Sequence, residues 1–197
     1  QEGFPYLHAS LWLMMLAINE TPAMQYRIIR QQQVPQEGED GTTRKENGTK
    51  EGGKEIVIRH HLVHASCPIL RKDGETYGFC VFESNNTSFA QFHAFAVQAL
   101  EEYHNSTEGL NKSPRDDILH GSVLPWIDFT HYEHATGSRP DIPKYVFGKL
   151  VHDEVTDKWS QSFCIHTHHA LADGIHVGQF LERFQRKFDQ AESLLMT

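Results

Sequence analysis

The sequence is poor in cysteine, has no excess of basic residues and contains no long uninterrupted apolar run. Its three cysteines, Cys67, Cys80 and Cys164, are odd in number and far apart, which suits a reducing compartment such as the cytoplasm better than a disulfide framework. The formal net charge of −8, with no basic cluster, argues against a nucleic-acid partner. The most apolar stretch, residues 4–18, is too short and too interrupted for a membrane span. We therefore expect neither a nucleic-acid nor a membrane partner.

The Cys-x-x-Cys and His-Glu-x-x-His motifs of many zinc sites are also absent from the sequence. Side chains of the kinds that bind zinc do occur near the C-terminus: His166, His168, His169, Asp173 and His176. Their spacing alone does not make a closed tetrahedral set, because a predicted turn separates them. A zinc hydrolase is thus a minor alternative, and we expect no metal. Strand geometry sends neighbours among His60, His61 and His64 to opposite faces, so we interpret them as solvent-facing or core histidines.

What is present describes one globular domain. The 197 residues are long enough for a substantial core, and 39% hydrophobic with 22% charged residues is ordinary for such a domain. We expect a single domain over residues 1–197, with a mobile polar insertion at about residues 31–54, where there is almost nothing to bury. Since the chain starts at Gln1 and not at Met, we expect an N-terminal segment to be missing or removed.

Apolar periodicity predicts a mixed order of helices and strands. Helices are expected at residues 4–18, 89–104 and 175–188, the second with Phe92, Phe95, Ala96 and Leu100 inward. Strands are expected at residues 25–30, 55–61, 62–70, 76–83, 118–123, 126–132, 144–152 and 159–168. Because strands dominate and helices are few and long, we predict an α+β fold, a mixed and mainly antiparallel sheet with helices packed on one face.

Residues 164–176 join the last predicted strand to the last predicted helix. A histidine at that junction suits a general base, because its unperturbed pKa of ~6.5 leaves it mostly neutral at physiological pH. Strand alternation would place His166 and His168 on one face and His169 on the other. Asp173 would fix the turn that carries the imidazole, cap the following helix, or do both.

The residues His168-His169-Ala-Leu-Ala-Asp173-Gly174 resemble the His-His-x-x-x-Asp-Gly signature of coenzyme A-dependent acyltransferases. The residues that follow, up to Leu181, are closest to the chloramphenicol acetyltransferases. Residues 124–130, Leu-Pro-Trp-Ile-Asp-Phe-Thr, are similar to the Pro-Trp-x-x-Phe segment of that family. Pro143, followed by Gly148-Lys149, stands at the family's distance beyond it.

This resemblance implies a two-layer sandwich that assembles as a homotrimer with active sites at subunit interfaces. It implies acetyl-CoA as co-substrate, no metal, and acetyl transfer to a hydroxyl of a small acceptor, chloramphenicol or similar, hence antibiotic resistance. His169, the second histidine of the pair, matches the general base. Asp173 and Gly174 match the residues that support the catalytic turn.

Four positions depart from the family's pattern. The oxyanion serine is replaced by His131, preceded by Thr130, and these two become the candidates for oxyanion stabilisation and substrate binding. The first arginine, Arg27, lies far beyond the family's partner for its aspartate. The threonine and tyrosine positions after Pro143 hold Val146 and Leu150. Two alternatives therefore stay open: an acyltransferase of the same fold with another acceptor, and a non-catalytic binding module.

Overall fold

The computed structural model describes residues 6–30, 55–85, 88–105, 115–135 and 139–196. The predicted insertion at residues 31–54 lies outside them. The helices are α1 (Tyr6–Asn19), the short 3-10 helix η1 (Pro22–Gln25), α2 (Phe89–Asn105), α3 (Gly174–Asp189) and α4 (Ala191–Leu195). The strands are β1 (Tyr26–Arg30), β2 (Glu55–Arg59), β3 (His64–Leu70), β4 (Tyr77–Phe82), β5 (Ile118–Val123), β6 (Lys144–Asp153) and β7 (Lys158–His166).

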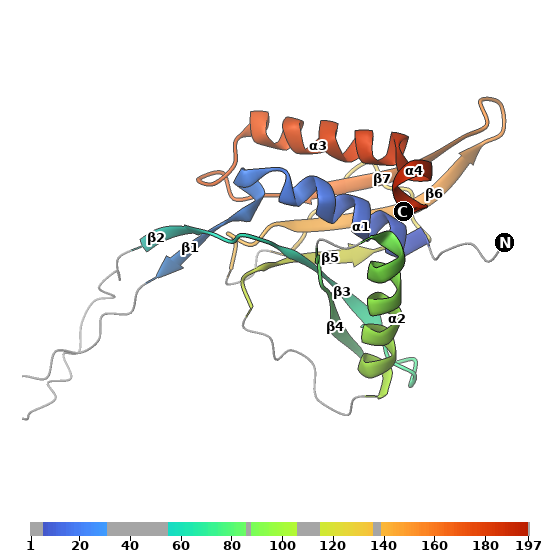
Figure 1. Cartoon of the computed structure of the whole chain (residues 1–197), viewed down its shortest axis with the longest axis horizontal. Coiled ribbons are helices and arrows are strands. Elements are labelled where there is room, and N and C mark those ends of the chain that lie inside the picture. The colour runs from blue at the N-terminus through green and yellow to red at the C-terminus, as the bar shows by residue number, and fades with distance from the viewer. Residues whose placement is uncertain (1–5, 31–54, 86–87, 106–114, 136–138, 197) are drawn as a thin grey trace, which may run out of the picture.

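The strands form a five-stranded sheet in the order β4-β3-β5-β6-β7 and a separate two-stranded ribbon of β1 and β2. Within the larger sheet β3–β5 and β5–β6 are parallel, whereas β3–β4 and β6–β7 are antiparallel. The ribbon is antiparallel and projects from the body at the opposite end from the β6–β7 turn (Figure 1). The predicted α+β fold with a mixed sheet is confirmed.

The long helices cover one face of the large sheet and enclose the core. Figure 1 shows α1 and α3 lying side by side across β5–β7, with α2 beside β3 and β4. Each contributes fully buried apolar side chains, such as Leu11 of α1, Phe92 of α2 and Phe180 of α3. Helix α1 is buried on almost every side, because the sheet and both other long helices contact it. That burial explains why its sequence is mostly apolar and shows no polar stripe.

The β6–β7 hairpin sets the position of the signature residues. The chain turns between Asp153 and Lys158, with Asp157 in the left-handed region at φ 53°. The register then pairs Lys144, the first residue of β6, with His166, the last residue of β7. As a result, residues that precede β6 and residues that follow β7 meet at one end of the sheet.

The predicted strand at residues 126–132 is wrong, because that segment is irregular. Its backbone bonds go elsewhere: the amide of Lys149 donates to Ile127 O at 2.8 Å, and the amide of Phe129 donates to Ser162 Oγ at 3.3 Å. The segment can lie this close to the sheet because Gly148 has no side chain; a Cβ there would stand 2.9 Å from Ile127 O.

Two further expectations about the helices need correction. Phe95 was expected to point inward but is 51% exposed, because α2 packs through a narrow stripe that includes Phe92 and Ala96. Helix α4 was not expected at all.

No helix in the described parts of the chain has both the length and the apolar character that crossing a membrane requires.

Candidate functional site

The turn between β7 and α3 is tightly bonded to itself. β7 ends at His166, so the strand alternation expected for His168 and His169 does not apply. Instead, the amides of Leu171 and Ala172 both donate to His168 O, at 2.8 and 3.0 Å. Ala172 is buried and anchors the turn on the protein. The turn therefore holds His169 by its backbone, while its side chain projects outward.

His169 and Asp173 are brought together by this turn. His169 Nδ1 lies 3.0 Å from Asp173 Oδ1, within ion-pair distance, and the two side chains are 88% and 62% exposed. The sequence predicted only an indirect role for Asp173 in holding the imidazole, and the structure adds a direct contact. Because this contact engages Nδ1, Nε2 is the ring nitrogen that it leaves for another partner.

Asp173 is also the N-cap residue of α3, as one of the two expectations had it. Its amide donates to Nδ1 of His176 at 3.0 Å, the third residue of the helix, in a capping-box arrangement. Gly174 follows as the first helical residue. A Cβ at that position would meet nothing within 4 Å, so packing does not explain its glycine.

His169 lies at a cavity of about 250 Å³ between the end of β7 and the start of β6. Its lining consists of His134, Pro140, Ile142, Lys144, His166, Thr167, His168 and His169. We name it the His169 cavity. Both His134 and Lys144 were missed by the sequence analysis. The β6–β7 register brings Lys144 beside His166, and the contact of His134 Nε2 with Tyr145 O brings His134 there.

His134 contributes a neutral imidazole to this cavity. Its Nε2 lies 3.2 Å from Tyr145 O, which fixes the proton on Nε2, and its ring stands edge-on to that of His166 at 5.4 Å between centroids. Burial lowers the pKa of His134, and the hydrogen bond to Tyr145 only partly opposes that effect. His166 in turn lies 3.4 Å, through Nε2, from Cys164 Sγ.

Thr130 and His131, the candidates for oxyanion stabilisation, are exposed and lie in the irregular segment after β5. Among the described residues that line the His169 cavity, neither is found. The segment runs along β7, with Tyr132 O 3.6 Å from Cys164 Sγ, before His134 reaches the cavity. Within one copy of the chain, the residue of this segment that lines the His169 cavity is therefore His134.

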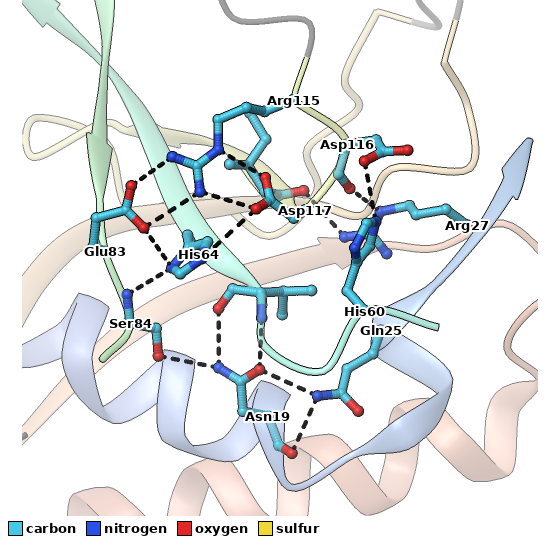
Figure 2. A network of polar contacts seen from close by, with 12 residues as sticks. Asn19, Gln25, Arg27, His60, His64, Glu83, Ser84, Arg115, Asp116 and Asp117 are labelled. Atoms are coloured by element: carbon cyan, nitrogen blue, oxygen red, sulfur yellow. Dashed lines mark hydrogen bonds and ion pairs between the residues drawn. The ribbon is translucent and has the colours of Figure 1, made fainter. Parts of the chain in front are cut away.

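Arg27 makes no contact with Asp173; it is fully buried in β1, beside Asp116 (Figure 2). Its guanidinium donates to four backbone carbonyls, those of Met24, Tyr26, Asp116 and Ile118. Burial lowers its pKa to about 10, against the opposing effect of Asp141 and Asp116. Within the described chain, no arginine or lysine lies at ion-pair distance from Asp173.

Of the three histidines His60, His61 and His64, the first and the last belong to a polar network around Arg115 (Figure 2). His64 Nδ1 accepts from the amide of Ser84 at 2.8 Å and lies 2.9 Å from Glu83, and burial lowers the pKa of His64. His60 Nε2 lies 3.1 Å from Asp116 Oδ1, at ion-pair distance but without hydrogen-bond geometry. In the residues covered by the structure, no group of three or more His, Cys, Asp or Glu side chains could hold a metal ion.

A family model described as chloramphenicol acetyltransferase matches residues 50–185. The chloramphenicol acetyltransferase of Bacillus pumilus is 31% identical over 124 residues, which cover 61% of this chain and 55% of that protein. One from Staphylococcus aureus is 30% identical over 120 residues, covering 59% of this chain and 56% of that protein. The match thus spans little more than half the length of these relatives.

Solved structures give the same fold. A chloramphenicol acetyltransferase matches with a TM-score of 0.66 at 18% identity, over 92% of this chain and 77% of that one. The dihydrolipoamide acetyltransferase of Azotobacter vinelandii matches with a TM-score of 0.62 at 15% identity, over 98% of this chain and 71% of that one. The two-layer α+β sandwich is common to all three.

Proposed function

Because the chain belongs to the chloramphenicol acetyltransferase family, we propose that it transfers an acetyl group from acetyl-CoA to a hydroxyl of a small-molecule acceptor, with His169 as general base. The observation that carries this proposal is the contact between His169 Nδ1 and Asp173 Oδ1 at 3.0 Å. It places Nδ1 beside a carboxylate oxygen and leaves Nε2, the other ring nitrogen, for the acceptor hydroxyl at the His169 cavity.

In the proposed reaction, His169 Nε2 takes the proton of the acceptor hydroxyl as that oxygen attacks the thioester carbonyl carbon. The carbonyl π electrons move to its oxygen and give a tetrahedral oxyanion. When the carbonyl re-forms, the C–S bond breaks and the thiolate leaves. The imidazolium returns its proton to the sulfur, so the products are the acetyl ester and free coenzyme A, and His169 is regenerated.

The oxyanion needs a donor placed for it. Thr130 has a hydroxyl and His131 a ring N–H, and both side chains are exposed. Because neither lines the His169 cavity of its own copy, we propose a homotrimer in which one copy supplies His169 and its neighbour supplies Thr130 and His131. Free, largely buried cysteines support a reducing, cytoplasmic setting for this assembly.

Two alternatives have specific support. Val146, fully buried, and Leu150 stand where the family has threonine and tyrosine, which favours an acceptor other than chloramphenicol. The missing oxyanion serine at His131 favours a non-catalytic binding module.

The test is release of free thiol from acetyl-CoA by the full-length chain, with and without chloramphenicol. His169→Gln should lower acceptor-dependent release by about 10²–10⁴-fold, and the 88% exposed ring predicts little change in stability. The matched control is His152→Gln on the β6–β7 hairpin, which should leave the rate unchanged. Release with other hydroxyl acceptors but not with chloramphenicol would retain the role of His169 as general base and show that the acceptor is another molecule. If coenzyme A neither turns over nor binds, the binding module replaces the enzyme.

A further inference from the structure

His134 and Lys144 are shared by two neighbouring cavities. On one side lies the His169 cavity of about 250 Å³. On the other lies a cavity of about 370 Å³ whose wall includes Phe79, His120 and Arg139, which we name the Lys144 cavity. A ligand that extends from His169 into the Lys144 cavity must pass Lys144.

Lys144 is a partly buried cation without a carboxylate partner. Its ammonium donates to Ala135 O. In the described parts of the chain, no Asp or Glu lies within ion-pair distance of it, although the chain has 26 acidic against 18 basic residues. Arg139, by contrast, is held by Asp141 through two hydrogen bonds of 2.9 and 2.8 Å. An ammonium has three N–H donors, so Lys144 retains two for a ligand.

The groups around Lys144 add to the positive electrostatic potential of the cavity wall. Burial is the main cause that lowers the pKa of His120, followed by Lys144, Arg27, His134 and Arg139, which are all cationic or potentially cationic. The pKa of His134 is lowered first by burial and then by His166 and Lys144. The neighbours that lower both pKa values are thus cationic or potentially cationic, which gives this wall a positive field, and Phe79 stands edge-on to His120 at 6.0 Å as an apolar surface beside them.

We propose that the Lys144 cavity binds an anionic group, a carboxylate or a phosphate, of the ligand whose reacting atom lies at His169. The inference rests on the proposed function, because that function places a hydroxyl or a thioester at His169. Two sources share this chemistry: the carboxylate of a hydroxy-acid acceptor, and a phosphate of coenzyme A. Charge-assisted hydrogen bonds to an ammonium suit both.

Binding to the full-length chain, measured by titration calorimetry, tests the inference without requiring turnover. One arm compares 4-(hydroxymethyl)benzoate with the neutral 4-(hydroxymethyl)benzamide. The other compares coenzyme A with pantetheine, which lacks every phosphate. We expect the anionic member of one pair to bind about tenfold more tightly. Lys144→Met and Lys144→Gln should abolish that preference, and Lys144→Arg should retain it. Lys149→Met, on the same strand but outside both cavities, is the matched control.

The arm in which the preference appears identifies the source of the anion. An equal effect of Lys144→Met and Lys149→Met, or no preference in either arm, overturns the inference. Two-state thermal melts of each variant separate loss of binding from loss of folding. Acetyl transfer without anion preference rejects this inference alone, whereas a Lys144-dependent preference without acetyl transfer rejects only the proposed function.

Discussion

Asp173 Oδ1 lies 3.0 Å from Nδ1 of His169, and the same residue is the N-cap of α3. The start of the helix and the proposed base therefore depend on one residue. The resemblance to the family implied that this aspartate supports the catalytic turn through an arginine. In this chain Arg27 is committed to backbone carbonyls at another place, and the direct contact is what links Asp173 to the imidazole.

Replacing Asp173 should separate its two roles. Asn caps helices about as well as Asp, so Asp173→Asn should keep stability while it removes the charge beside His169. Because the pair is largely exposed, we expect kcat to fall only about fivefold. Asp173→Ala should also lower the free energy of unfolding by about 1 kcal/mol, through loss of the cap. Parallel kcat and urea-unfolding measurements check both, and equal stability losses in the two variants would show that the cap contributes nothing.

Arg27 should be one of the residues that stability depends on most. Arg27→Met leaves four carbonyls without their donor, those of Met24, Tyr26, Asp116 and Ile118. We expect the free energy of unfolding to fall by about 3 kcal/mol, because buried unsatisfied acceptors are costly. Arg186→Met on the surface of α3 loses only an exposed pair with Glu182 and should change it by less than about 0.5 kcal/mol. Urea unfolding measures both, and similar values for the two would contradict the burial argument.

The sequence was sufficient for what depends on local patterns. Apolar periodicity located the long helices and most strands, and the spacing from Asp173 to the apolar face of α3 predicted the cap. It was not sufficient where distant segments decide the outcome. Lys144 reaches the His169 cavity only because it pairs with His166 across β6–β7, a register that no local pattern specifies.

The errors have the same origin. Residues 126–132 have strand-like composition, yet tertiary contacts at Gly148 and Ser162 take up the backbone hydrogen bonds that a strand would need. Phe95 matches the helical periodicity of α2, but the described residues leave half of its side chain exposed. In residues 126–132 tertiary contacts thus overrode the strand propensity, whereas α2 is helical as predicted and only the burial of Phe95 was wrong.

The cysteines should differ sharply in reactivity. Cys67 and Cys80 face each other across β3 and β4, and burial raises their pKa values to about 12 and about 11. Because the thiolate is the reactive form, both should resist a thiol-specific disulfide reagent at pH 8 in the folded protein. Cys164, which is only partly buried, should react first, and all three should react in denaturant. Peptide mapping of the labelled sites checks this, and early labelling of Cys80 would contradict it.

His8 should make the fold sensitive to acid. Its Nδ1 lies 2.9 Å from Nδ1 of His93, so α1 and α2 meet through two imidazoles. Burial, with His93 as the second cause, lowers the pKa of His8 from 6.5 to about 4. Between these two values the unfolded chain binds more protons than the folded one, so stability falls as the pH falls from 6.5 to about 4 and is unaffected by this group above that range.

His8→Phe removes this titration and places an apolar ring beside Phe82. The slope of unfolding free energy against pH over that window should become shallower by up to about 1 kcal/mol per pH unit. His61→Phe changes an exposed ring and should leave the slope unchanged. Urea unfolding at half-unit steps from pH 4 to pH 8 gives both slopes. The same slope in His8→Phe and in the unmodified chain would mean that the acid sensitivity comes from other groups. His64, in the polar network around Arg115, would be the next residue to test, because burial lowers its pKa as well.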